Sequence, residues 1–146
     1  MKNYRRKFTT KNFLLGATFS ILLTACSNPS PVLPEPETLA GYWLVESIND
    51  ESVIKDSKVD LIFTAENQLS GTSSCNNFST SYSQENNSLT LGNMATTRKM
   101  CLPALMEQET TVLHALSKVK RFQLSNGQLS LFDQQGVLQI QAKRTK

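Results

Sequence analysis

The segment Arg121-Phe122-Gln123-Leu124-Ser125-Asn126-Gly127-Gln128-Leu129-Ser130-Leu131-Phe132 gives the clearest indication of the fold class. Polar and apolar residues alternate on both sides of Asn126-Gly127, as they do in strands with one buried face. An Asn-Gly pair readily adopts the positive φ angles of a two-residue type I′ turn. The segment therefore predicts a β-hairpin, and a second turn at Gln135-Gly136 leads into a predicted strand over residues 137–142.

Five segments nearer the N-terminus also predict strands, because runs of β-branched, aromatic and aliphatic residues are bounded there by polar turns. These segments are residues 42–48, 59–64, 68–74, 78–83 and 89–91. A single segment predicts a helix, which begins at Pro103 and has Lys118 and Lys120 toward its far end. Its apolar residues recur at mostly helical spacing and should pack on one mouth or face of the sheet. They are Leu102, Leu105, Met106, Val112, Leu113, Leu116 and Val119.

The N-terminal residues 1–25 have the pattern of a bacterial lipoprotein signal peptide. Five basic residues precede an apolar run from Phe13 to Leu23, and Leu23-Thr24-Ala25-Cys26 then places small residues before a cysteine. The alternative is a transmembrane helix, but about 20 apolar residues are needed to cross a bilayer and this run is roughly half as long. We therefore expect cleavage before Cys26 and attachment of lipid to its thiol.

Residues 26–38 are expected to form the lipidated cysteine and a Pro-rich linker, because four of the chain's 5 prolines lie in this part. Proline-rich segments favour extended polyproline II and act as semi-rigid spacers. Ser27 stands where lipoproteins of the inner membrane typically carry Asp, which favours a lipid anchor in the outer membrane and a domain that faces the periplasm. Residues 39–144 remain for one domain with one core.

The positive net charge of the whole chain comes from the signal peptide. Removing its five basic residues leaves 10 Lys and Arg against 12 Asp and Glu, so the mature charge is about −2. We therefore expect no nucleic-acid partner. The basic clusters around Lys118 and Lys143 have no interleaved aromatic residues and are interpreted as solvated faces.

Cys75 and Cys101 form an even pair once Cys26 is assigned to lipid, and in an exported protein such a pair is expected to form a disulfide. A zinc site is a weaker alternative, because it would need more ligands than two cysteines and the single His114. A redox role is also weaker without C-x-x-C spacing. The residues indicate no metal, no cofactor and no catalytic site: nucleophile elbows, metal-ligand clusters and glycine-rich phosphate loops are all missing from the sequence.

A bridge between Cys75 and Cys101 would bring the turn after Cys75 beside the loop before Cys101. Two cations would then stand among hydroxyl and amide groups, a combination able to bind an anion or a carboxylate of a partner. The candidate partner-binding residues are Asn76, Asn77, Thr96, Thr97, Arg98 and Lys99. The alternative is that these small polar residues only complete turns.

Several motifs in order resemble the META domain of heat-shock lipoproteins of the HslJ type, over about residues 39–142. They are Gly41-Tyr42-Trp43-Leu44, Leu61-Ile62-Phe63, Leu69-Ser70-Gly71, Ser74-Cys75-Asn76-Asn77-Phe78 and Met94-Ala95-Thr96-Thr97-Arg98-Lys99-Met100-Cys101. Ser74 departs from the pattern, because many members have Gly there. The resemblance implies a small, barrel-like antiparallel β domain with one α-helix packed against it, in agreement with the periodicity.

The resemblance also implies a function in envelope stress tolerance, with heat-shock induction and novobiocin resistance. We expect a non-catalytic, monomeric module that is held at the membrane through Cys26 and meets an envelope protein partner. The alternative is a small-ligand-binding or enzyme-inhibitor β-barrel lipoprotein. Large side chains inside the barrel, as Trp43, Phe63 and Leu131 suggest, would leave little room for such a ligand.

Overall fold

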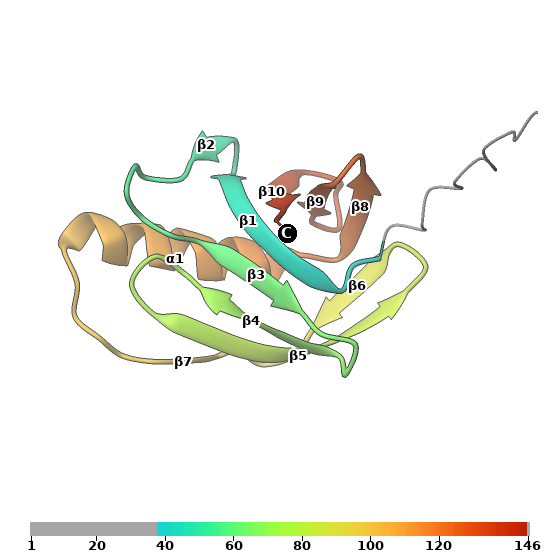
Figure 1. Cartoon of the computed structure of the whole chain (residues 1–146), viewed down its shortest axis with the longest axis horizontal. Coiled ribbons are helices and arrows are strands. Elements are labelled where there is room, and N and C mark those ends of the chain that lie inside the picture. The colour runs from blue at the N-terminus through green and yellow to red at the C-terminus, as the bar shows by residue number, and fades with distance from the viewer. Residues whose placement is uncertain (1–37, 146) are drawn as a thin grey trace, which may run out of the picture. The chain divides into compact units, whose positions relative to one another are not determined.

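The computed structural model describes residues 38–145, which form a mainly β domain with one helix (Figure 1). The strands are β1 (Gly41–Ile48), β2 (Glu51–Ser52), β3 (Asp60–Phe63), β4 (Gln68–Thr72), β5 (Asn77–Glu85), β6 (Ser88–Leu91), β7 (Ala95–Thr96), β8 (Arg121–Ser125), β9 (Gln128–Phe132) and β10 (Leu138–Arg144). The helix α1 is Pro103–Lys118. The signal peptide, Cys26 and all of the predicted linker except residue 38 lie outside the described residues.

The strands form an antiparallel barrel of eight strands, which confirms the predicted fold class. The order around the barrel is β10-β9-β8-β6-β5-β4-β3-β1, and pairing of β1 with β10 closes it. Each ring strand matches one of the eight predicted segments. The two-residue strands β2 and β7 pair with β1 and β5, respectively, outside this ring. The sequence did not predict them, because two residues are too few to show an alternation of polar and apolar side chains.

The hairpin of β8 and β9 forms as its sequence predicts. Asn126 and Gly127 have φ angles of 52° and 74°, the left-handed values that a type I′ turn requires. The turn fixes the register, so that Leu124 faces Leu129 and Phe122 faces Leu131. The side chains of Leu129 and Leu131 are consequently fully buried.

The barrel interior is filled by large side chains from several strands. Trp43, Phe63 and Leu131 are each at most 2% exposed. The Trp43 indole donates a hydrogen bond to the Leu39 carbonyl oxygen at 2.8 Å, and the rings of Phe63 and Tyr82 meet edge to face with centroids 5.2 Å apart. Packed side chains therefore fill the space inside the barrel.

The two ends of the domain's chain meet at Arg144. Its guanidinium donates hydrogen bonds to the carbonyl oxygens of Thr38 and Ala40 and lies 4.4 Å from the centre of the Trp43 ring. The cation-π contact and the two hydrogen bonds hold the first described residues against β10. The point at which the described chain enters the barrel is therefore fixed beside the C-terminal end of β10.

Helix α1 packs against β1 and β10 through its second half, where Val112, Ala115 and Leu116 are fully buried. Pro103 occupies its first turn, as predicted. The predicted apolar stripe is wrong at its N-terminal end, because Leu102 and Met106 are 72% and 43% exposed. There the helix no longer faces the strands of the barrel.

Gln108 holds this overhanging part of α1 to the loop that follows β2. Its side-chain oxygen accepts a hydrogen bond from the Ile54 backbone N–H at 2.7 Å, and its side-chain nitrogen donates to Ser57 Oγ at 2.7 Å. These two hydrogen bonds offset the free-energy cost of burying the polar side chain of Gln108. Within residues 38–145, no helix combines the length and apolar character needed to cross a membrane.

Candidate functional site

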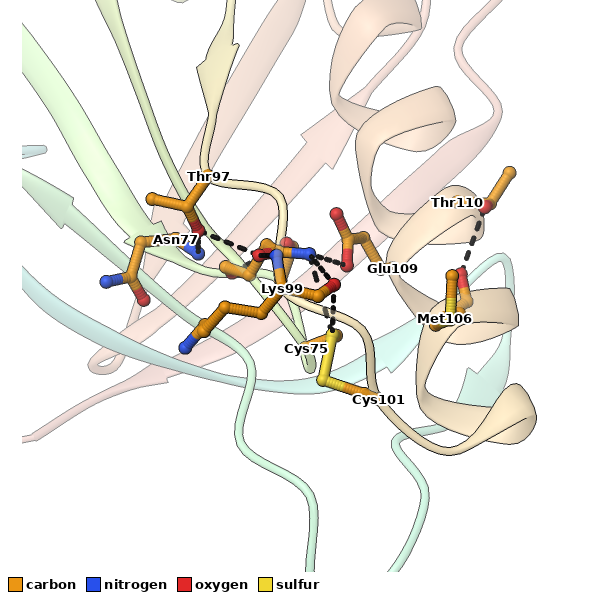
Figure 2. The surroundings of a disulfide bond; sticks show 10 residues. Cys75, Asn77, Thr97, Lys99, Cys101, Met106, Glu109 and Thr110 are labelled. Atoms are coloured by element: carbon orange, nitrogen blue, oxygen red, sulfur yellow. Dashed lines mark hydrogen bonds between the residues drawn. A yellow bond between two sulfur atoms is a disulfide. The ribbon is translucent and has the colours of Figure 1, made fainter.

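Cys75 and Cys101 form a disulfide, with an S–S distance of 2.01 Å and a Cα–Cα distance of 5.9 Å (Figure 2). Cys75 lies in the turn between β4 and β5, and Cys101 lies in the extended loop between β7 and α1. The bond spans 26 positions of the chain. It brings together the two segments that carry the candidate partner-binding residues.

The Asn76 side chain joins the two segments a second time. Its oxygen accepts hydrogen bonds from the Lys99 backbone N–H at 2.7 Å and from Thr97 Oγ1 at 2.8 Å. Its nitrogen donates to the Lys99 carbonyl oxygen at 3.3 Å and to Glu109 Oε2 at 2.9 Å. This amide, only 5% exposed, therefore ties the turn, the loop and helix α1 into one unit.

Asn77 and Thr97 extend this connection. The Asn77 backbone N–H donates to Thr97 Oγ1 at 3.1 Å, and the Thr97 backbone N–H donates to the Asn77 carbonyl oxygen at 3.0 Å (Figure 2). Thr96 belongs to β7 and pairs with Phe78 of β5. Asn76 and Thr97 thus use their polar side-chain atoms inside the protein, as expected of residues that complete turns.

Arg98 and Lys99 have exposed side chains at this site. The ion pairs among residues 38–145 join Lys58 to Asp60 and Lys143 to Glu46, so these two cations have no carboxylate partner in the described part of the chain. The six candidate residues are therefore gathered in one place. The side chains of Asn76 and Thr97 form hydrogen bonds that support the loop, whereas Arg98 and Lys99 present cationic side chains.

Ser74, the residue that departs from the family pattern, has a φ of 90°. This backbone conformation favours glycine, because a Cβ atom makes it sterically costly. The Ser74 hydroxyl is also buried without a hydrogen-bond partner. The turn before Cys75 is nevertheless closed, since the Ser73 backbone N–H donates to the Asn76 carbonyl oxygen at 2.8 Å.

A second polar cluster lies around Asp60 on β3, and the sequence did not predict it. The Asp60 carboxylate accepts hydrogen bonds from Tyr42 Oη at 2.5 Å and from the Thr72 backbone N–H at 2.7 Å. Lys58 Nζ lies 2.7 Å from the same carboxylate. The sequence offered one signal, an acidic residue between Val59 and Leu61 in an apolar strand. A carboxylate that is buried in a strand needs hydrogen-bond or ion-pair partners.

The pKa of Asp60 lies below its ordinary value of 3.8. Burial alone would raise the pKa, but hydrogen bonds from Lys58, Tyr42 and Thr72 stabilise the carboxylate and outweigh that effect. The same contact with Asp60 raises the pKa of Lys58. Because the carboxylate is fully paired in this cluster, it serves to join β1, β3 and β4.

Two hollows lie near these features. One of about 210 Å³ is lined by Ile54 and Glu107, among others, between the β2 region and α1. Another of about 270 Å³ lies over the Asp60 cluster. Trp43, Phe63 and Leu131 line neither of them, so both lie outside the filled interior. Among residues 38–145, no three His, Cys, Asp or Glu side chains are grouped closely enough to hold a metal ion.

Comparison with known proteins agrees with this architecture. The sequence model of the META domain matches residues 37–145. The chain is 31% identical over 114 residues to Heat shock protein HslJ of Escherichia coli (strain K12), and this alignment covers 77% of the chain and 81% of the relative.

Two solved structures are similar in fold. One, determined by NMR, has a TM-score of 0.58 and 27% identity, and the match covers 71% of this chain and 88% of that one. The other is an NMR structure of a protein from Burkholderia xenovorans, with a TM-score of 0.60 and 19% identity over 80% of this chain and 99% of that one. The second likeness concerns the fold alone.

Proposed function

This chain belongs to the META domain family, and we propose that it is a non-catalytic, lipid-anchored envelope protein that faces the periplasm and contributes to stress tolerance. The observation that carries the stress role is the 31% identity to Heat shock protein HslJ, which extends over most of both chains. Tolerance of heat and of novobiocin are the expected activities in the cell. The outer membrane is the proposed site of anchoring.

The non-catalytic part of the proposal is supported by how the polar groups are used. Asn76, Thr97 and Asp60 place their polar atoms in hydrogen bonds that join segments of the fold. Glu109, a carboxylate of α1 beside the disulfide loop, accepts a hydrogen bond from Asn76. An internal ligand has no support either, because Trp43, Phe63 and Leu131 fill the barrel.

Anchoring is supported by the sequence Leu23-Thr24-Ala25-Cys26 behind a basic and apolar leader. Replacement of Cys26 by Ala, or treatment of the cells with globomycin, should give an unprocessed or unlipidated protein that leaves the membrane fraction. The measurement is fractionation followed by mass determination of the N-terminal peptide. The variant with Cys75→Ser and Cys101→Ser is the matched control and should stay lipidated. A wild-type N-terminal peptide that lacks the added mass of lipid on Cys26 would refute the anchor.

A further inference from the structure

Three large apolar side chains are exposed where α1 begins. Met100 is 91% exposed, Leu102 72% and Met106 43%, and we call these three residues the apolar tip. The Met106 backbone N–H donates a hydrogen bond to the Leu102 carbonyl oxygen, so these two residues lie one turn apart on the same side of the helix. Met100 precedes Leu102 by two residues in the extended loop.

The segment that presents the apolar tip is held rigidly. Cys101 stands between Met100 and Leu102 and is bonded to Cys75, while the Lys99 backbone is bound on both its N–H and its carbonyl by Asn76. Single exposed apolar residues are common on protein surfaces, but three within seven positions of a fixed segment indicate a contact surface.

Unpaired positive charge adjoins the tip. Arg98 and Lys99 come directly before Met100, and within residues 38–145 neither forms an ion pair. Two helix carboxylates lie nearby but form no ion pair with Arg98 or Lys99: Glu109 accepts a hydrogen bond from Asn76, and Glu107 lines the hollow beside Ile54. Apolar side chains flanked by unpaired cations are typical of segments that enter the interface of an anionic membrane.

We propose that the apolar tip, together with Arg98 and Lys99, inserts into the headgroup region of an anionic phospholipid bilayer. The side chains of Met100, Leu102 and Met106 are exposed and line neither hollow described above, so the tip presents its apolar surface outward. A protruding group of flexible side chains suits a deformable lipid surface, which needs no complementary groove. The negative lipid headgroups complement the two cations.

The proposal does not depend on the proposed anchoring, because the tip belongs to the domain itself. Figure 1 shows the start of α1 well away from the beginning of β1, where the described chain enters the barrel.

The test uses residues 27–146 without lipid, which include every core residue from Leu39 to Ala142. Flotation measures partitioning onto vesicles of phosphatidylcholine alone and onto vesicles with about one third phosphatidylglycerol. We expect binding to the anionic vesicles that weakens with salt. Met100→Ser with Leu102→Ser should lower the partition coefficient at least about tenfold, and Lys99→Gln about fivefold.

Matched controls are Val137→Ser, at an apolar residue 55% exposed elsewhere, and Lys118→Gln, at the far end of α1. Both should bind like the wild type, and thermal melting confirms that each variant is folded. Absence of binding, or equal binding by the tip variants, would overturn the proposal. The proposal would also be overturned if the protein self-associates and the tip substitutions abolish this, because the tip would then bind a second copy of the chain. None of these three results bears on lipidation of Cys26, because the protein tested carries no lipid.

Discussion

Replacing both Cys75 and Cys101 by Ser is expected to lower the free energy of unfolding by about 3.5 kcal/mol under oxidising conditions. The disulfide closes a segment of 26 positions, and its loss returns conformational entropy to the unfolded chain. This amount is a large share of the roughly 5 to 15 kcal/mol that stabilises a typical domain. The melting temperature should fall on the order of 15 °C, as measured by circular dichroism.

Reduction of the wild-type protein supplies the control for this prediction. The reduced wild type and the double Ser variant lack the same cross-link, so they should melt at similar temperatures. Adding reductant to the double Ser variant should change nothing. Equal melting of the oxidised wild type and the variant would show that the bond between Cys75 and Cys101 contributes little to stability.

Replacing Asp60 by Ala should also be strongly destabilising, by about 3 kcal/mol. The substitution removes the acceptor of the Tyr42 hydroxyl and of the Thr72 backbone N–H, and it leaves Lys58 without its ion pair. Because Asp60 is only 2% exposed, water does not readily replace the lost acceptor. Chemical denaturation at neutral pH measures the difference. An effect comparable to that of a surface substitution would contradict the assigned role of the cluster.

The stability contribution of Asp60 should depend on pH in a defined direction. Its folded pKa is lowered from 3.8, so the contribution is present above that value and disappears as the pH falls through the folded pKa. The isosteric variant Asp60→Asn cannot ionise. The difference in unfolding free energy between wild type and Asp60→Asn should therefore shrink from about pH 5 downward. A difference independent of pH would mean that the charge of Asp60 does not stabilise the fold.

Local sequence signals predicted the barrel strands well. Asn126-Gly127 specifies a turn by its own backbone preferences, and the alternation around it specifies which side chains face inward. The strands β2 and β7 escaped prediction because each is too short to show a period. Periodicity also predicted wrongly that Leu102 and Met106 are buried. It indicates which side of a helix is apolar, but not which turns of the helix pack against the barrel.

The candidate site was predicted only in part, because long-range hydrogen bonds do not appear in local patterns. The number of cysteines predicted a bond between Cys75 and Cys101, and this bond predicted that the polar residues around them lie together. The central position of Asn76 depends on partners 21 to 33 positions away, which no local spacing reveals. Asp60 likewise draws its partners from three segments. The exposed tip was hidden for a different reason, since Met and Leu at helical spacing resemble core residues.

A function in stress tolerance at the membrane can be tested by measuring survival of cells. A strain without this protein is challenged with heat and with novobiocin, and is complemented with the wild type or with Cys26→Ala at equal protein levels. Loss of the protein should lower survival, the wild type should restore it, and Cys26→Ala should not. Unchanged survival of the deleted strain, or full restoration by Cys26→Ala, would contradict the claim.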